Sequence, residues 1–375
     1  MNIVICGDTF PTTENYKYFK GTRVRKCFDK EILDYIYKAD YSICNLEGAL
    51  TDSKRKIKKS GPALRAPIKC INGIKELGFK CVCLANNHVM DFGSEGLSDT
   101  INALESAGIQ WVGTGNNRTC LKKYTCLEKN DVKVIIYNVA EVEFNIPQDN
   151  YPGCNIWDDY ETYKDIEELK NISDHVIVVY HGGVEEFRYP TPIVRKRCCN
   201  MVESGASIVL TQHSHCIGVE ERYKNGYCLY GQGNFSFGIN NDDYSGSGIL
   251  LELQINKKTY NINKHLIQLK HGRSIYAKNQ DFSDFLLRSD ILNDKEKYKK
   301  LFLQFCYERM INDLEVLIGK NIYNRIIKKI LPKKIYYNYI RKMYNNRNIY
   351  TVINSFRCSD HREIIINGFL QLDNR

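Results

Sequence analysis

Residues 1–270 alternate short apolar segments with segments in which apolar residues return every three or four positions. The apolar segments, such as residues 2–6, 41–44 and 175–180, have the length and the β-branched content of buried strands. Because such strands alternate with helical segments, the order is typical of α/β proteins. We therefore predict one large layered α/β domain for residues 1–270, which is long enough to bury a sizeable core.

Nearly every predicted strand ends in side chains suited to catalysis or metal binding. The residues in question are Asp8, Glu47, Asn87, His88, His181, His213 and His215. In open α/β sheets, ligands bind in the crevice at the carboxyl ends of the strands. A polar residue after one strand has little meaning, but its recurrence after strand upon strand indicates a shared pocket.

The clearest of these strand ends is the sequence LANNHVMDFG, residues 84–93. Residues 80–85 predict a short buried strand. Residues 93–107 predict a helix that ends at Gly108, a residue type suited to the left-handed conformation after a helix. The loop between them carries Asn86, Asn87, His88 and Asp91. We expect this loop to line the pocket.

The predicted pocket contains carboxylate, amide and imidazole groups and no cysteine. Such ligands suit the divalent ions Mn²⁺, Fe²⁺ or Zn²⁺. Considered alone, His88 could instead be a structural histidine, and Asp8 could instead be a turn residue. Taken together, these groups predict a metal site. If residues 213–215 are extended, His213 and His215 point to the same side and can bind as a pair.

The 15 cysteines lack the spacing of a zinc ribbon. Cys81 and Cys83 alternate along a predicted strand, and Cys198 with Cys199 lies in a predicted helix, so buried reduced thiols are expected. Residues 1–6 lead directly into a strand without the features of a signal peptide. We therefore expect a cytoplasmic protein without a membrane span.

The order of the motifs resembles that of one protein family. The motifs are GD, NLEG, LANNHVMDFG, HGGVEEFRYP, TQHSH and LYGQGNFSF. Over approximately residues 1–250 they resemble the capsule-synthesis protein CapA family, also called the poly-γ-glutamate biosynthesis family, whose domain is similar to the calcineurin-like metallophosphatases. The resemblance implies a metallophosphatase-like layered α/β fold with mixed central sheets.

The resemblance also implies a role for each polar residue. The implied metal ligands are Asp8, Glu47, Asn87, His181, His213 and His215. Glu47 takes the place of a bridging aspartate. His88 corresponds to the histidine that acts on the leaving group or transition state, and Asp91 is expected to orient its imidazole.

Two residues depart from the metallophosphatase pattern. Phe10 stands where the phosphatases have a histidine, and Glu47 is one methylene longer than their aspartate. We therefore expect a weaker or differently coordinated first ion, and a single ion is an alternative to two.

Three further residues are candidates for the pocket. Glu185 follows His181 by about one helical turn and is expected to be a general base or, preferably, a carboxylate that supports the ligands. Arg65 lies in a rigid loop and is either a substrate-binding residue for a carboxylate or phosphate, or a surface arginine. Asn234 is expected to brace the histidine loop, and it is a second candidate for substrate binding.

These residues predict a metal-dependent hydrolase or group-transfer enzyme that acts at a phosphoester or an acyl or amide centre. His88 would donate a proton or a hydrogen bond to the oxyanion. Through the resemblance, we expect an anionic polymer or its precursor as substrate, in capsule or cell-surface polymer biosynthesis. The alternative is a non-catalytic polymer-handling or scaffold subunit that keeps the fold for binding.

The net charge of +9 is concentrated near the carboxyl end. Residues 295–347 carry 14 Lys and Arg against 4 Asp and Glu, a local charge of +10. Helical spacing is present in residues 282–287, 298–318, 321–331 and 335–344. We predict a basic, mainly helical extension at residues 281–375. One alternative is that this extension binds the inner face of a membrane or an anionic polymer, with nucleic acid as a weaker candidate. The other is that its helices pack on the catalytic domain.

Overall fold

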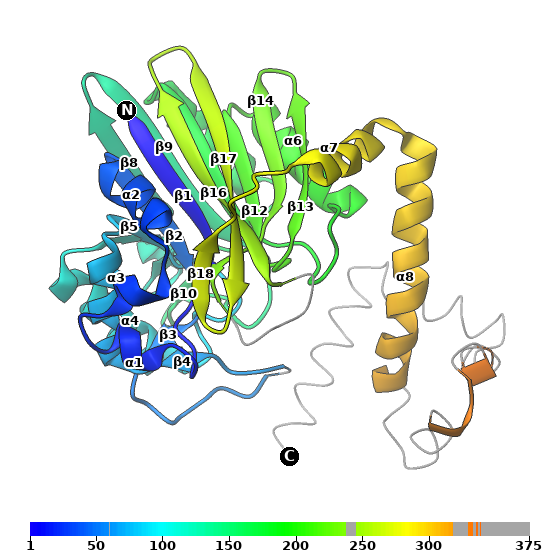
Figure 1. Ribbon diagram of the computed structural model, residues 1–375, viewed down its shortest axis with the longest axis horizontal. Coiled ribbons are helices and arrows are strands. Elements are labelled where there is room, and N and C mark those ends of the chain that lie inside the picture. The colour runs from blue at the N-terminus through cyan, green and yellow to red at the C-terminus, as the bar shows by residue number, and fades with distance from the viewer. Residues whose placement is uncertain (60, 238–244, 318–328, 333–334, 337, 339–375) are drawn as a thin grey trace. The chain divides into compact units, whose positions relative to one another are not determined.

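The computed structural model describes residues 1–59, 61–237, 245–317, 329–332, 335–336 and 338. The chain divides into two compact units, Met1–Lys295 and Glu296–Arg375. The first unit contains two large β-sheets (Figure 1). It also contains every residue of the predicted pocket.

The first sheet has eight strands and is mixed. Its order is β18-β17-β16-β1-β2-β5-β6, and β15 pairs with β1 in addition. The strands are β1 (Asn2–Thr9), β2 (Tyr41–Leu46), β5 (Cys81–Cys83), β6 (Gln110–Val112), β15 (Asn234–Ser236), β16 (Ser247–Ile255), β17 (Tyr260–Lys270) and β18 (Arg273–Tyr276). The first four run parallel, whereas β16, β17 and β18 continue the sheet antiparallel.

The second sheet has six strands and is mixed as well. Its order is β13-β14-β12-β11-β9-β8. The strands are β8 (Tyr124–Lys129), β9 (Val132–Ala140), β11 (His175–His181), β12 (Ile208–Gln212), β13 (Ile217–Tyr223) and β14 (Gly226–Gln232). The inner four are parallel, and β8 and β13 flank them antiparallel. The sequence does not predict these two edge strands, because YTCLEK and IGVEERY are rich in polar residues.

The two sheets pack face to face because side chains alternate along each strand. On β1, Ile3 and Ile5 belong to the core that includes Val134 of the second sheet. Val4 points the other way, into a core that includes Leu97 of the helical layer. Strands covered on both faces require apolar residues at successive positions. This requirement explains the continuous apolar runs in the sequence.

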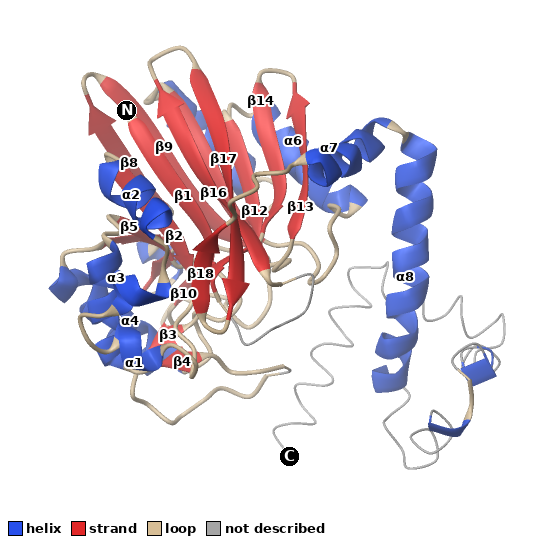
Figure 2. Ribbon diagram, viewed as in Figure 1, coloured by secondary structure: helices blue, strands red, loops and turns tan. Residues whose placement is uncertain are grey.

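Helices cover the outer face of each sheet (Figure 2). The helices over the first sheet are α1 (Tyr16–Phe19), α2 (Lys30–Lys38), α3 (Ile71–Leu77) and α4 (Gly93–Ala107); those over the second are α5 (Glu161–Asn171) and α6 (Pro192–Glu203). The α4 helix has the predicted bounds and ends at Gly108, where φ is 73°. The layered α/β fold with mixed sheets is thus confirmed.

Short elements complete the first unit. They are β3 (Ala49–Leu50), β4 (Arg65–Ala66), β7 (Thr114–Gly115), β10 (Gly153–Cys154), and the 3-10 turns Val24–Cys27, Ile68–Cys70, Arg118–Cys120 and Ile291–Asn293. The predicted strand thiols Cys81 and Cys83 are buried, and burial raises the pKa of Cys81 to about 12. None of the cysteines within the described ranges forms a disulfide.

Two helices follow the sheets. The α7 helix (Ser283–Asp290) packs against β13, and α8 spans Lys295–Leu317. The predicted helices at 321–331 and 335–344 lie largely outside the described residues, so the mainly helical extension stays a prediction. No helix in the described part of the chain is long and apolar enough to cross a membrane.

Candidate metal centre

The predicted site residues gather where strands of both sheets end. Asp8 lies near the end of β1, Glu47 directly follows β2, and His181 is the last residue of β11. The loops after β5 and β12 supply Asn87, His88, Asp91, His213 and His215. Asp8 and Glu47 have no exposed surface. The two-sheet topology therefore gathers side chains that are far apart in the sequence.

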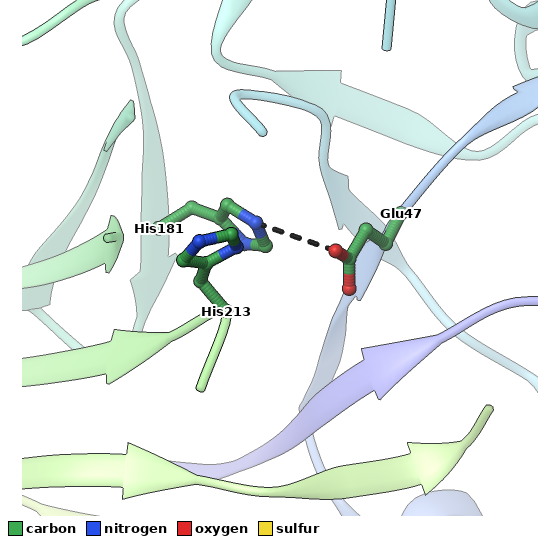
Figure 3. A group of neighbouring side chains, drawn as sticks. All are labelled: Glu47, His181 and His213. Carbon is green, nitrogen blue, oxygen red and sulfur yellow. Dashed lines mark ion pairs between the residues drawn. The ribbon is translucent and has the colours of Figure 1, made fainter. Parts of the chain in front are cut away.

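Glu47, His181 and His213 form a first group of potential ligands (Figure 3). Both imidazole rings face the carboxylate, and one ligand atom from each residue lies within 4.8 Å of the others. Nε2 of His181 lies 3.5 Å from Oε1 of Glu47 and 3.0 Å from Oδ1 of Asn87. Ligands about 2.1 Å from a tetrahedral ion lie about 3.4 Å from each other. The spacing of these atoms therefore fits a shared cation.

Asp8, Glu47 and His215 form a second group with the same spacing. Nδ1 of His215 lies 3.5 Å from Oδ2 of Asp8, and its Nε2 lies 3.6 Å from Oε1 of Glu47. Glu47 belongs to both groups. Its carboxylate could therefore serve as a ligand in either group.

The carboxylate of Glu47 has an unusual environment. Both of its oxygens are buried, and neither has a hydrogen-bond donor among the described residues; the same holds for Nδ1 of His213. Nε2 of His181 and Nε2 of His215, at 3.5 and 3.6 Å from Oε1, form ion pairs with this carboxylate only when their rings are protonated. Taking a carboxylate out of water costs several kcal/mol. Buried polar groups without partners require a physical explanation. A divalent cation between the carboxylate and the imidazoles supplies one.

Burial and the imidazoles push the pKa values of the two carboxyl groups in opposite directions. Burial, followed by the nearby charge of Glu47, raises the pKa of Asp8 to about 6. Burial acts in the same direction on Glu47, but the imidazoles of His215 and His181 outweigh it and lower that pKa to about 2. Both carboxylates are therefore ionised above pH 6, as metal binding requires.

The imidazoles also differ from one another. Burial and the neighbouring His181 lower the pKa of His213 to about 3, so this ring is neutral at physiological pH. Burial lowers the pKa of His181 and of His215, but Glu47 and then Asp8 act against it, and both pKa values are raised. A bound cation replaces the proton that Glu47 attracts to these rings.

The two histidines of the TQHSH motif do not lie on an extended segment, so the condition under which they were expected to point to the same side is not met. Their φ angles are 87° at His213 and 56° at His215, so the backbone turns twice through the left-handed region. The backbone N–H of His213 donates to Oδ2 of Asp8 at 3.2 Å, which ties this turn to β1. The rings, 6.3 Å apart, therefore enter different ligand groups.

Phe10 fills the place at which the metallophosphatases carry a histidine. Its side chain is 3% exposed. The ring lies against Gly48, where an added Cβ would be 2.6 Å from it, and 6.2 Å from the ring of Phe237. Phe10 therefore packs as an apolar residue, and it offers no ligand to the second group.

His88 and Asp91 form a pair beside the ligand groups. Nδ1 of His88 lies 2.6 Å from Oδ2 of Asp91. The same carboxylate accepts hydrogen bonds from Nζ of Lys59 at 2.6 Å and from the backbone N–H of Leu64 at 2.7 Å. These donors hold Asp91 where it can orient the imidazole, with Nε2 as the ring nitrogen left for a substrate.

The other three predicted residues have different surroundings. Oδ1 of Asn234 lies 3.0 Å from Nδ1 of His215, so this buried amide is placed to hold a ligand. Arg65 is exposed and donates to the carbonyl of Ser53 at 2.7 Å. Glu185 is exposed, and its charge acts with those of Glu47 and Asp8, against burial, to raise the pKa of His215.

Three residues at the site are not predicted from the sequence. Asn45, inside the NLEG motif, donates to Oδ1 of Asp8 at 2.8 Å. Glu143 lies 3.7 Å from Nε2 of His213, and burial raises its pKa. The third is Lys59, which lies in a run of basic residues. Glu143 closely follows the apolar run of residues 132–139, so the strand-end criterion could have found it, but nothing in the sequence places Lys59.

The chain is similar in sequence to known capsule-synthesis proteins. The family profile described as "Bacterial capsule synthesis protein PGA_cap" matches residues 2–239. The capsule biosynthesis protein CapA of Bacillus anthracis is 30% identical over 234 residues, which cover 58% of this chain and 57% of that protein. The PGA biosynthesis protein CapA of Bacillus subtilis strain 168 is 28% identical over 229 residues, or 58% of this chain and 60% of that protein. The match thus spans less than two thirds of each relative.

Solved structures with a similar fold include the NAD nucleotidase NadN of Haemophilus influenzae. It has a TM-score of 0.44 and 13% sequence identity, over 82% of this chain and 67% of that one. The profile match covers well over half of the chain and contains all the candidate ligands from Asp8 to His215. The chain therefore belongs to the bacterial capsule synthesis protein PGA_cap family.

Proposed function

We propose that this protein is a metal-dependent hydrolase or group-transfer enzyme that acts at a phosphoester or an acyl or amide centre in the synthesis of a capsule or another cell-surface polymer. The observation that carries the proposal is the buried carboxylate of Glu47, which lies among three imidazoles and has no hydrogen-bond donor among the described residues. Family membership supplies the biosynthetic context. The substrate in this proposal is an anionic polymer or its precursor.

The donor set fits one or two ions of Mn²⁺, Fe²⁺ or Zn²⁺. The residues that would hold them are Asp8, Glu47, Asn87, His181, His213 and His215. When bound, such ions act as Lewis acids and lower the pKa of a water molecule.

The protein's own groups position the substrate and move protons. Asp91 holds Nδ1 of His88, so that Nε2 can give a proton or a hydrogen bond to the departing oxygen. A positioned general acid contributes typically about 10²–10⁴ in rate. Glu143 lies 3.7 Å from Nε2 of the candidate ligand His213, and it therefore takes the supporting role in this proposal.

Metal analysis combined with a substrate panel tests the proposal. Wild type, His213→Ala and the control Glu168→Gln, which changes an exposed carboxylate on α5, are purified gently, resupplied with Mn²⁺, Fe²⁺ or Zn²⁺ and desalted. We expect bound metal in wild type and control, a loss in His213→Ala, and metal-dependent turnover of a phosphodiester or an amide. Equally low metal in all three proteins would refute the ligand assignment.

The packing of Phe10 favours a second candidate, a polymer-handling or scaffold subunit without turnover. A missing ligand in the second group weakens one ion site and leaves a binding fold. His88→Ala separates the two candidates. Turnover that disappears in this variant while metal content persists supports the enzyme, whereas polymer binding without turnover in wild type supports the scaffold.

A further inference from the structure

Figure 1 shows the long loop that connects β3 to β4. Its sequence is strongly basic. Five of the six residues from Lys54 to Lys59 are Lys or Arg, and we call this segment the basic loop. Its exposed members are Lys54, Arg55, Lys56 and Lys58. Arg55 pairs with Glu95 at 3.1 Å, but its side chain is 87% exposed, and such pairs are weak. The loop therefore presents a dense positive charge to solvent.

The end of the basic loop is anchored in the candidate active site. The backbone N–H of Ile57 donates to the carbonyl of Asp91 at 2.9 Å. Nζ of Lys59 donates to the carboxylate of Asp91 at 2.6 Å and lies 3.3 Å from Nδ1 of His88. The side chain of Lys59 is only 4% exposed, in contrast to its neighbours. The run of cations thus begins in solvent and ends at the His88–Asp91 pair.

The composition of the loop indicates which kind of polyanion it fits. The six residues contain no aromatic side chain on which a nucleobase could stack. Ile57 is the one apolar residue among them and is half-buried, so the loop lacks the apolar face that inserts into a membrane. Six residues span at most about 20 Å of extended backbone, and five of these six carry a cationic side chain. This density matches a flexible chain with a carboxylate on each short repeat.

We propose that the basic loop is a docking surface for a polycarboxylate chain and guides that chain to the His88–Asp91 pair. This inference rests on the proposed function, because it names the surface that would recruit the substrate of the same site. The exposed cations attract the chain, and the buried Lys59 fixes the loop against the site. The attraction is electrostatic and therefore weakens with salt.

Binding of fluorescent poly-L-glutamate to the full chain tests the proposal. The variant is Lys54→Glu with Lys56→Glu. The control is Lys257→Glu with Lys258→Glu, which changes the net charge equally in the exposed turn between β16 and β17. We expect the loop variant to weaken binding about tenfold and the control less than about twofold. An equal effect of both variants, or no effect of either, would overturn the proposal.

Carbodiimide coupling supplies a local readout, because it joins carboxylates to nearby amines. Coupling of poly-L-glutamate to wild type, followed by peptide mapping, should label Lys54 and Lys56 in preference to Lys257 and Lys258. Labelling confined to the carboxyl-terminal residues 296–375, or equally tight binding of single-stranded DNA or anionic vesicles to the basic loop, would refute the assignment.

These measurements are made with chelator present, so they do not depend on turnover. If polymer binding depends on the basic loop but the protein hydrolyses no substrate, the docking surface is supported and only the proposed enzymatic function is refuted. If the protein hydrolyses a small ester in a metal-dependent reaction but its polymer binding does not depend on the basic loop, only the docking surface is refuted. The two proposals therefore fail separately.

Discussion

Replacing Asp8 by asparagine should stabilise the metal-free protein at neutral pH and weaken the metal-bound one. Asp8 is fully buried, and burial together with Glu47 raises its pKa from 3.8 to about 6. The folded protein thus holds this proton more tightly than the unfolded chain does. The stability that this group contributes is complete below pH about 4 and is lost as the pH rises through about 6.

The magnitude follows from the pKa difference and the hydrogen bonds. About two pKa units correspond to roughly 3 kcal/mol at pH 7. Asparagine removes this cost and keeps an oxygen for Nδ2 of Asn45, which now lies 2.8 Å from Oδ1. In the variant, an NH₂ group replaces Oδ2 of Asp8, the acceptor for the backbone N–H of His213. Two donors then face each other, and loss of this hydrogen bond costs about 1 kcal/mol. The net expectation is a gain of about 2 kcal/mol at pH 7 and a loss of about 1 kcal/mol at pH 4.

Urea unfolding of Asp8→Asn and wild type from pH 4 to pH 8, with chelator or with Mn²⁺, measures both effects. Without metal, the variant should become the more stable protein as the pH rises. An ion at 100 times its dissociation constant stabilises wild type by about 2.7 kcal/mol, and the variant gains less because it lacks a charged ligand. Our reasoning is refuted if the metal-free difference does not change with pH, or if the variant is less stable at pH 7.

Three further predictions test separate parts of the structure. Glu47→Gln removes the ligand common to both groups and should abolish metal binding at both, whereas His215→Ala should spare the first group; mass spectrometry of bound metal distinguishes these results from equal losses. His88→Ala should lower turnover by about 10²–10⁴ at unchanged metal content, and a parallel loss of metal would assign His88 to the ligand set instead. Thr191→Ala removes the side-chain acceptor for the backbone N–H of Val194 at the start of α6 and should cost about 1 kcal/mol of stability without loss of metal; unchanged thermal unfolding would show that this cap does not matter.

Local sequence patterns predict the regular elements well. The helical spacing of residues 93–107 and the glycine after it identify α4, and the apolar runs identify the inner strands of both sheets. Such patterns work because burial on both faces leaves little choice of residue type. The edge strands β8 and β13 escape prediction because one side of an edge strand meets solvent, so its composition resembles that of a loop.

The site shows where local patterns stop. The strand-end criterion and the family resemblance together indicate Asp8, Glu47 and His181, because the fold brings strand ends to one edge. They do not reveal that Glu47 belongs to two ligand groups, or that residues 213–215 turn through left-handed conformations. They also do not predict the contact of Lys59 with Asp91, which joins residues 32 positions apart.

The sequence by itself determined the residue types of the site, the order of strands and helices, and the family to which the chain belongs. These properties depend on composition and on spacing along the chain, which short-range rules can interpret. Only the tertiary structure decided which oxygen and nitrogen atoms face one another, why Glu47 lacks a donor, and which lysine reaches His88. Those outcomes depend on how the two sheets and the loops at their strand ends pack in space. A contact of 3 to 4 Å between residues far apart in the chain produces no periodic pattern in the sequence.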